Sequence, residues 1–545
     1  MLKDFRVLSG LTIAVLLAGG CRSAEEYEAE RFSKVPQAIE KITNGKVLPE
    51  GTVLTLQDCM RMAIENNRDL RVYEQKQKVA KEKIYAEVMG MLPDLTVTNE
   101  ITGRDNTPAS SSENVTGGTG GTYSASQSSD RNVNNLKVEM ALSALDFGLS
   151  YLNAAQAEDY SLIEDQQLRR AKQNLMLDVV RTYYRVAATQ DAIETTNALL
   201  EKCKQVEVAL EDLAQNRTLS PLRLSDEAKR FYRLEKQLME YRRNYNNACI
   251  ELRALMGYLP ISDIKVDTSL IKNMQIKELP DINLLEKIAL TQRPELYQLD
   301  IQTNIMVNES RKTLLMMFPN VKAFVDWNNS NNSFLYHQSW WEIGAVAAYN
   351  LLKLPQNIYR YRAQREQVNE IDERTLALSI GVMSQVRIAH ANIIEVKEQF
   401  ELDDKIAQKF AMHAKMARES YKAGGALTQL ELDRLELEAA EAEIDRMLSL
   451  SNYYVAYQRL INAVGVDNID PETVGLLEKK IAEAEAKEHA LSEREKQAIA
   501  NVQNSVKDNG QVMFKGVVVG ENTLSPEMRD RLNALVPQEE ADAAL

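Results

Sequence analysis

Histidine and cysteine are the side chains in this 545-residue sequence best suited to bind a metal or attack a substrate, and they are few. Beyond residue 21 they share only their wide spacing: Cys59, Cys203, Cys249, His337, His390, His413 and His489. Zinc sites use ligands close together in the sequence, and a catalytic site needs a nucleophile with a base or paired carboxylates arranged beside it. The sequence therefore predicts no enzyme, no metal site and no cofactor.

The remaining cysteine, Cys21, follows an apolar run at the N-terminus. Lys3 and Arg6 precede the apolar residues 7–17, a length and charge order typical of a secretory signal rather than a membrane-spanning helix. The string LLAGGC resembles the bacterial lipobox, in which the cysteine is diacylated and becomes the mature N-terminus. We therefore expect a lipoprotein signal peptide over 1–20 and lipidation of Cys21. An ordinary cleaved signal with an incidental cysteine is the alternative.

Charge and composition narrow the possible partners. Arg22 follows the cysteine where an aspartate would favour the inner membrane, so the lipobox resemblance implies the outer membrane. The net charge of −14 argues against nucleic acid as a partner, because a negative protein is repelled by phosphate. No later stretch has about twenty consecutive apolar residues, so any membrane crossing must use strands.

The sequence contains two copies of one pattern. Ala63 and Pro93 in the first copy align at a constant offset with Ala289 and Pro319 in the second. Each copy predicts an amphipathic helix ended by proline and followed by a strand. Further along, ELRALMGY aligns with RLINAVGV at a shorter offset, so the first copy carries an insertion. Residues 103–131 supply it, because they are mostly glycine, serine, threonine and asparagine and predict an exposed loop.

Apolar and polar residues alternate on both sides of each copy's loop, which predicts strands with one apolar face. The alternating segments are 95–101, 136–144, 321–327 and 341–351. All three tryptophans, Trp327, Trp340 and Trp341, lie around the second loop. Aromatic residues gather at the ends of membrane-spanning strands, so we interpret the segments as membrane strands with interfacial tryptophans. A soluble hairpin with exposed aromatics is the alternative.

Between and after the strands, apolar residues recur every seven residues, as in a coiled coil. The uninterrupted pattern from 146 to 216 predicts a helix of roughly 100 Å. A helix of that length indicates an extended bundle rather than a compact domain. The expected divisions are a signal peptide at 1–20, an N-terminal segment at 21–53, a first repeat at 54–265, a linker at 266–279, a second repeat at 280–467 and a C-terminal extension at 468–545.

The order and duplication of these elements resemble the TolC-like family of outer-membrane efflux proteins, in its lipoprotein form. The resemblance is carried by LTLQDCMRMAIENNRDL (54–70), the proline-led strands, the glycine-terminated coiled coils and YKAGGALTQLELDRLELEAAEAEI (421–444). It covers about residues 54–467 and implies a mainly α fold with a β-barrel part. Each chain would give a long coiled-coil tunnel plus four membrane strands, completed as a trimeric twelve-stranded barrel.

The resemblance also implies a function and partners. It is that of the outer-membrane exit channel of a tripartite efflux pump or type I secretion system, a passive conduit that works with a periplasmic adaptor and an inner-membrane transporter. Adaptor contact falls on the turn residues Ala423, Gly424, Gly425, Ala426, Ser220 and Pro221. The rival hypothesis is a lipid-tethered periplasmic coiled-coil scaffold without a pore.

A pore constriction is implied near Asp433, where members of the family commonly carry a carboxylate. The usual earlier acidic position is Leu430 here, and Glu431 is the candidate substitute. Three copies of such a carboxylate near one axis would form a negative ring that favours cations. The alternative is that Asp433 and Glu431 are the solvated face of a charged helix beside Arg434.

Overall fold

The computed structural model describes residues 23–43, 51–111, 124–215, 220–259, 264–272, 278–424, 428–509, 511–514 and 517–520. These residues divide into two compact units, Met1–Asp467 and Asn468–Leu545. The predicted lipidation site Cys21 and the predicted adaptor residues Gly425 and Ala426 lie outside the described residues. The predicted mainly α fold with four strands in each chain is confirmed, because the first unit joins long helices to a four-stranded sheet.

The first unit begins with short elements that lead into the first repeat. They are α2 (Ala24–Thr43), β1 (Val53–Leu54), α3 (Leu56–Asn66) and α4 (Arg68–Met89). Thr55 starts α3 through a capping box, in which its side chain and that of Asp58 bind each other's backbone N–H groups. Asn67 separates α3 from α4 and accepts a hydrogen bond from Leu70 N at 3.0 Å, so one residue ends one helix and caps the next.

Four antiparallel strands, two from each repeat, form one sheet in the order β2, β5, β7, β8. Their bounds are β2 (Asp94–Gly103), β5 (Asn132–Ser143), β7 (Asn320–Ser330) and β8 (Ser339–Ala348). The short strands β3 (Ala109–Ser110) and β4 (Ser126–Gln127) pair within the first loop. The predicted strands on both sides of each loop are therefore confirmed, and the pairing of β5 with β7 joins the two repeats.

Long helices follow the strands in both repeats. The first repeat has α5 (Ala144–Gln215) and α6 (Pro221–Leu255), followed by β6 (Lys265–Val266) and α7 (Ser269–Lys272). The second has α8 (Ile282–Gln292), α9 (Pro294–Leu315), the short η1 (Leu351–Lys353), α10 (Leu354–Lys422) and α11 (Gln429–Val464). The predicted long helix is confirmed by the 72 residues of α5, roughly 110 Å at the usual rise.

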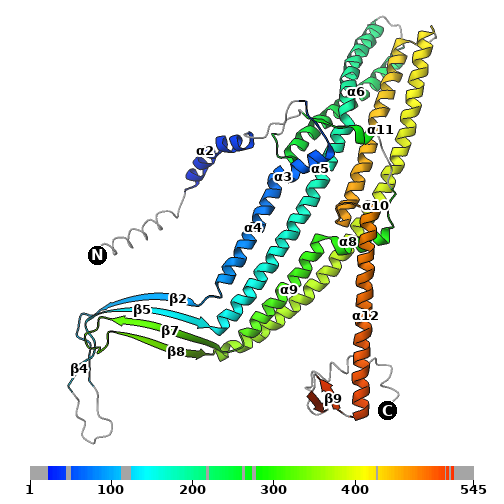
Figure 1. Ribbon diagram of the computed structural model, residues 1–545. Helices are drawn as coiled ribbons and strands as arrows, with labels where there is room; N and C mark the ends of the chain where they lie inside the picture. The colour runs from blue at the N-terminus through cyan, green and yellow to red at the C-terminus, as the bar shows by residue number, and fades with distance from the viewer. Residues whose placement is uncertain are drawn as a thin grey trace. The chain divides into compact units, whose positions relative to one another are not determined.

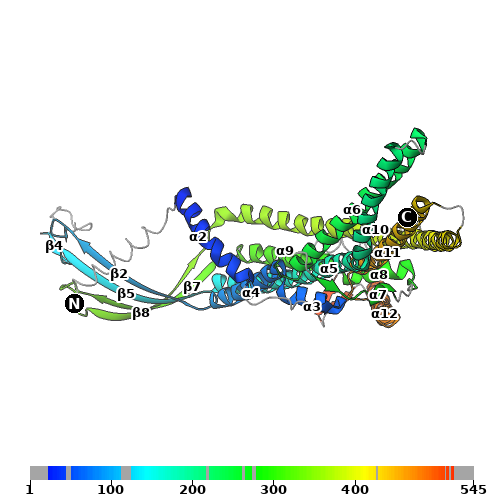
Figure 2. The ribbon, with the colours of Figure 1, turned by 90° about the horizontal axis from the view of Figure 1, so that it is seen from above.

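The helices next to the sheet pack in the same order as the strands. Helix α4 packs on α5, α5 on α9, and α9 on α10. The sheet lies at one end of these helices, and the ends of the α5–α6 and α10–α11 hairpins lie at the other (Figure 1, Figure 2). Strand β1 pairs in parallel with β6 and connects the start of the first repeat to its end.

Buried cysteines lie in two apolar clusters of the first unit. Cys59 and Cys249 are in a cluster around α3, α5 and the end of α6, and Cys203 is in a second cluster between α5 and α6. All three are reduced thiols. Burial raises the pKa of Cys59 to about 12 and that of Cys203 to about 11.

The second unit contains α12 (Pro471–Asn509) and a hairpin of β9 (Gln511–Phe514) and β10 (Val517–Gly520). The predicted exposed helix at 478–497 lies within α12. Across both units, none of the helices that the structure describes combines the length and apolar character that a membrane span requires.

Candidate functional site: a two-faced sheet and the ends of the long helices

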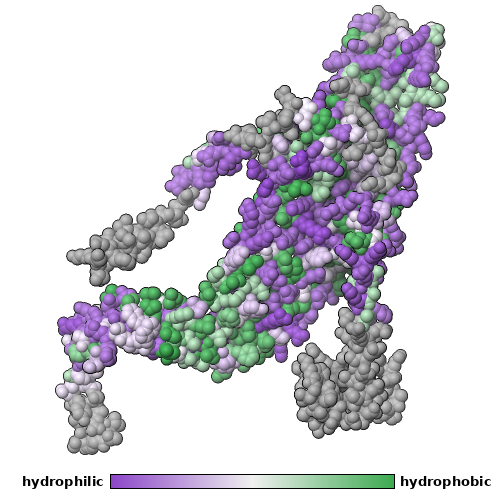
Figure 3. Space-filling model, in the orientation of Figure 1, coloured by the Kyte–Doolittle hydropathy of each residue, from purple (hydrophilic) through white to green (hydrophobic). Residues whose placement is uncertain are grey.

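One face of the four-stranded sheet is apolar. Residues directly opposite each other in neighbouring strands point to the same face, so the register assigns every side chain to a side. Val97 lies opposite Val138, Val138 opposite Trp327, and Trp327 opposite Trp341. Leu95, Met140, Val325 and Ile343 form the next row in the same way. In Figure 3 hydrophobic residues gather over the sheet.

Every charged residue of these four strands lies on the other face. In the strand register, these residues occupy the alternate positions whose side chains all point to this second face. They are Asp94, Glu100, Lys137, Glu139, Lys322, Asp326 and Glu342. A sheet whose one face lacks any charge while the other carries all of them is built to separate an apolar medium from a polar one.

The charged face contains a chain of ion pairs across β5 and β7. Lys137 Nζ lies 2.8 Å from Asp326 Oδ2 and 2.7 Å from Glu139 Oε2, and Lys322 Nζ lies 2.6 Å from Glu139 Oε1. These residues line a hollow of about 360 Å³, together with Phe324 and Glu342. Asp326 and Glu342 lie directly opposite each other, so carboxylates outnumber ammonium groups here.

The three tryptophans do not share one face. Trp327 and Trp341 form a cross-strand pair on the apolar face, and Trp341 is 72% exposed. Trp340 lies opposite Asn328 on the charged face. The neighbouring positions of Trp340 and Trp341 require this separation, because successive residues of a strand point to opposite faces.

At the far end of the helices, Glu431 is part of a helix cap. Thr428 starts α11, and its N–H and hydroxyl donate to Glu431 Oε2 at 2.9 and 3.0 Å. Hydrogen bonds from the backbone and side chain of Thr428 lower the pKa of Glu431. The Glu431 carboxylate therefore caps the start of α11 in its own chain.

Asp433 makes an ion pair with the first repeat. Lys202 Nζ on α5 lies 2.8 Å from Asp433 Oδ1 and 2.8 Å from Glu436 Oε2, both on α11. Burial disfavours the charge of Lys202, but its hydrogen bonds to the two carboxylates outweigh this and raise its pKa. Arg418 of α10 also binds Glu436 at 2.9 Å. Lys202 carries no signal of this role in the sequence, because heptad spacing does not show which helices meet across repeats.

Of the predicted adaptor residues, the structure describes Ala423, Gly424, Ser220 and Pro221, which lie at helix ends. Helix α10 ends at Lys422, Ala423 is its C-cap, and Gly424 has a positive φ of 76°. Glycine suits this left-handed conformation, which lets the chain turn back. At the other turn Ser220 precedes Pro221, the first residue of α6, and proline fits that first helical position.

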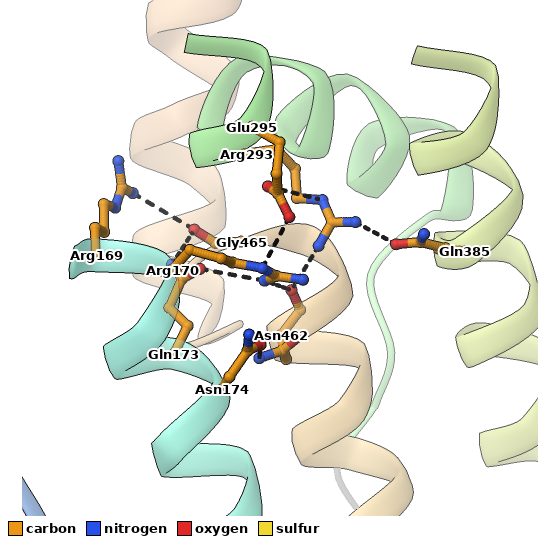
Figure 4. A network of polar contacts seen from close by, with 9 residues as sticks. All are labelled: Arg169, Arg170, Gln173, Asn174, Arg293, Glu295, Gln385, Asn462 and Gly465. Atoms are coloured by element: carbon orange, nitrogen blue, oxygen red, sulfur yellow. Dashed lines mark hydrogen bonds and ion pairs between the residues drawn. The ribbon is translucent and has the colours of Figure 1, made fainter. Parts of the chain in front are cut away.

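A buried polar network lies where α5 meets the start of α9 and the end of α11 (Figure 4). Arg293, only 2% exposed, donates from Nη1 to Asn462 O at 3.3 Å and from Nη2 to Gln385 of α10. Arg170 of α5 donates to the same Asn462 carbonyl at 3.0 Å and pairs with Glu295 Oε1 at 2.8 Å. Burial lowers the pKa of both arginines.

The network ends α11 by satisfying its last carbonyls. Gln173 and Arg169 donate to Gly465 O at 2.8 and 3.4 Å, and Asn462 Nδ2 donates to Asn174 at 3.1 Å. Positive groups at a helix C-terminus are favourable, because carbonyl dipoles concentrate negative charge there. The repeat pattern located this stretch, TQRPEL, without showing that its arginine contacts the first repeat.

Residues 59–258 match the sequence model of a family described as outer membrane efflux protein. The predicted resemblance to this family is thereby confirmed. No curated protein matches the chain in sequence.

Solved outer membrane channels are similar to this chain in fold. MtrE of Neisseria gonorrhoeae is 14% identical with a TM-score of 0.58, over 75% of this chain and 89% of MtrE. CmeC of Campylobacter jejuni is 13% identical with a TM-score of 0.56, over 82% of this chain and 94% of CmeC. VceC of Vibrio cholerae is 13% identical with a TM-score of 0.54, over 75% of this chain and 96% of VceC.

Proposed function

We propose that this chain forms an outer-membrane exit channel that works with a periplasmic adaptor and an inner-membrane transporter. The observation that carries the proposal is the complete segregation of charge onto one face of the sheet. The apolar face would contact lipid, with Trp327 and Trp341 near its boundary, while the charged face would line a water-filled lumen. Trp340 would then face the lumen.

Closure of the sheet requires further copies. Strands β2 and β8 end the strand order, so each pairs on one side only within the chain. Unpaired backbone groups in lipid cost about several kcal/mol each, and pairing β8 of one copy with β2 of the next removes them. Three copies give the twelve-stranded barrel that the family resemblance implies.

Exposed apolar side chains on the outermost helices support the same assembly. On α10, Leu376, Ile380 and Ile388 are each more than 60% exposed, and on α4 Val72 and Val79 are more than half exposed. In the row of packed helices α4 and α10 are the two outermost, just as β2 and β8 are the two outermost strands of the sheet. A second copy would therefore bury both stripes as it pairs the strands.

The ion pairs of Lys202 would hold the far end of the tunnel closed. They tie α5 of the first repeat to α11 of the second through Asp433 and Glu436. Moving the α10–α11 hairpin away from α5 must break them. The nearby turns at Ser220–Pro221 and Ala423–Gly424 would meet the adaptor, and lipidation of Cys21 would add a second attachment to the outer membrane.

Conductance in planar bilayers tests the channel. Purified protein should form trimers and give stable single-channel currents, because twelve paired strands enclose a polar lumen. A monomeric rod without conductance would instead support the lipid-tethered scaffold.

The closing role of Lys202 predicts a gain of conductance in Lys202→Ala. Asp433→Ala should act in the same direction with a smaller effect, because Glu436 keeps its ion pair with Lys202 and so retains part of the contact between α5 and α11. Lys204→Ala is the matched control, since Lys204 forms an exposed ion pair with Glu201 on its own helix and, among the described helices, none with α11. Glu431→Ala should destabilise the start of α11 by about 1 kcal/mol through loss of the cap. Equal conductance in all four variants would remove Lys202 and Asp433 from the gate.

A further inference from the structure

The hollow on the charged face of the sheet has the size of a small-molecule site. Its volume of about 360 Å³ lies at the lower end of the ~300–1,000 Å³ that is typical of such sites. Phe324, Val346 and Ala348 form its apolar part, and carboxylates and ammonium groups form much of its polar part. This combination of surfaces suits a ligand that carries both a charge and an apolar body.

The hollow carries one negative charge that its own ammonium groups do not neutralise. Its carboxylates are Glu139, Asp326 and Glu342, and its ammonium groups are Lys137 and Lys322. Both ammonium groups are engaged by Glu139 or Asp326. Glu342 is exposed and forms no ion pair or hydrogen bond with the described residues, so it is the carboxylate left over.

A buried carboxylate oxygen next to Glu342 lacks a hydrogen-bond donor. Asp326 lies directly opposite Glu342 in the register and is only 1% exposed. Its Oδ2 pairs with Lys137 at 2.8 Å, whereas its Oδ1 is buried without a partner among the described residues. Buried polar atoms are almost always hydrogen-bonded, because leaving one unpaired is costly. Oδ1 therefore favours a ligand that brings an N–H donor.

The ring of Phe324 supplies an apolar contact in the same hollow. Phe324 lies opposite Ala141 of β5 and Gly344 of β8. A Cβ on Gly344 would come within 2.5 Å of the ring atom Cζ, so the ring occupies space that glycine leaves open. Lys137 Nζ lies 5.8 Å from the ring centroid, within the range of a cation–π interaction. The ring is therefore placed where positive charge is already favoured.

Pairing with a further copy through β2 would not supply the missing cation. The proposed barrel places β2 of the next copy beside β8, the strand that carries Glu342. The charged-face residues of β2 include no basic residue; they are Asp94, Thr96, Thr98, Glu100 and Thr102. This strand would add negative charge or none, so Glu342 would stay unpaired beside it.

We propose that this hollow binds an organic cation that combines an N–H donor with a flat apolar body, such as an amidinium or a protonated aryl amine. The positive charge would lie between Glu342 and Asp326, the N–H would donate to Asp326 Oδ1, and the apolar body would contact Phe324. The location of the site in a lumen rests on the proposed channel, whereas the hollow and its unpaired carboxylates belong to the single chain.

Direct binding of benzamidinium to the purified full-length protein tests the site. Neutral benzamide is the matched probe, because it has nearly the same shape without the charge. Ligand-observed NMR in detergent, with empty micelles as the background, should detect binding of benzamidinium and little binding of benzamide. Equal binding of the two probes would overturn the proposal.

Two carboxylate variants separate a site from a general attraction for cations. Glu342→Gln should weaken benzamidinium binding by about tenfold or more, the expected loss of one charge-assisted hydrogen bond. Glu100→Gln is the matched control, because it removes the same charge from the same face of the sheet but lies outside the hollow. It should leave the affinity unchanged. Equal weakening in both variants would show a diffuse negative potential and would overturn the proposal.

Gly344→Ala tests the contact with the ring while keeping every charge. The added Cβ must displace the ring of Phe324, so the affinity for benzamidinium should fall although Asp326 and Glu342 are intact. An unchanged affinity would overturn the proposed contact with Phe324.

Conductance and trimer formation are measured on the same preparations. Benzamidinium should reduce the single-channel current reversibly, and should do so less in Glu342→Gln. A conducting trimer that does not bind benzamidinium would refute only the site, and a protein that binds it without conducting would refute only the channel.

Discussion

Each repeat joins the end of its last long helix to the start of its second short helix, but the first repeat uses an asparagine and the second an arginine. Asn67 caps α4 and donates from Nδ2 to Leu255 O at the end of α6. Arg293 occupies the aligned position before α9 and reaches Asn462 O of α11 and Gln385 of α10. Both junctions pack against a glycine with a positive φ, Gly257 or Gly465.

The difference between the junctions is one of reach. An asparagine has one short amide and serves only its own repeat, whereas a guanidinium has five N–H donors on a long stem. Arg293 therefore shares the Asn462 carbonyl with Arg170, which comes from α5 of the first repeat. The second junction therefore links the two repeats, whereas the first makes its contacts within its own repeat.

The largest effect is expected from Arg293→Ala, which removes one of the two guanidinium groups at Glu295 and the Asn462 carbonyl and takes the buried donor away from Gln385. Removing one member of a buried charged network typically costs about 3–5 kcal/mol, whereas Asn67→Ala should cost about 1–2 kcal/mol as a lost cap. Thermal unfolding in detergent compares the two variants. Arg293→Lys should restore little, because an ammonium cannot bridge the same acceptors. A larger loss in Asn67→Ala would reverse the assignment of the stronger junction.

Substitution of the two glycines should give the opposite order, with the greater loss of stability at the first junction. A Cβ at Gly257 would lie 2.5 Å from Asn66 O, whereas one at Gly465 would lie 3.2 Å from the flexible Arg293 Cδ. The left-handed backbone costs alanine about 1–2 kcal/mol at either site. The nearest backbone atom would lie at 2.5 Å from a Cβ at Gly257 and at 3.3 Å from one at Gly465, so Gly257→Ala adds the more severe clash. Unfolding midpoints of the two alanine variants should therefore fall further for Gly257. Equal midpoints would mean that α3 moves away from Gly257 without loss.

The smallest effect concerns two contacts between the repeats that respond differently to acid. Burial raises the pKa of Asp445, which accepts from Tyr241 of α6, and burial and neighbouring carboxylates raise that of Glu441. For Glu436, burial acts in the opposite direction, but Lys202 and Arg418 outweigh it and lower its pKa. When folding raises the pKa of a carboxyl group, the folded state binds protons more readily than the unfolded state, so acid stabilises the fold. When folding lowers the pKa, the ionised group stabilises the fold near neutral pH, and this contribution is lost only when the pH falls below the ordinary pKa of the group.

Lowering the pH from about 7 toward 5 should therefore relieve the burial of charge on Asp445 and Glu441 of α11 and leave the Lys202 link unchanged. Unfolding midpoints should rise slightly over this range, and Glu441→Gln should reduce the rise. A fall in the midpoint, abolished by Lys202→Ala, would show that the link titrates instead.

The sheet was largely predictable because its signal is local. A two-residue alternation identifies each strand, and the charges at Lys137, Glu139 and Asp326 already share its polar phase. The register between the strands shows what a single strand cannot, namely that the polar positions of all four strands lie on the same face of the sheet. The alternation also separates Trp340 from Trp341, although their adjacency suggested a single aromatic cluster.

The helix contacts were less predictable because their partners are distant in sequence. Heptads predict that α5 is long, but the same spacing fits many neighbours, so the pairing of Lys202 with Asp433 and of Arg293 with Asn462 required three dimensions. Glu431 had a readable local signal, since threonine three residues before glutamate is a capping box. The capping box accounts for the presence of Glu431 without a role in a pore.

The buried thiols have a consequence for how the chain matures. Cys59, Cys203 and Cys249 belong to packed clusters, and the raised pKa values of Cys59 and Cys203 keep little thiolate available for exchange. If the chain is exported as proposed, it meets an oxidising compartment while still unfolded, when all three thiols are exposed to disulfide formation. Their survival then depends on packing being faster than oxidation, which makes timing during export a requirement of this fold.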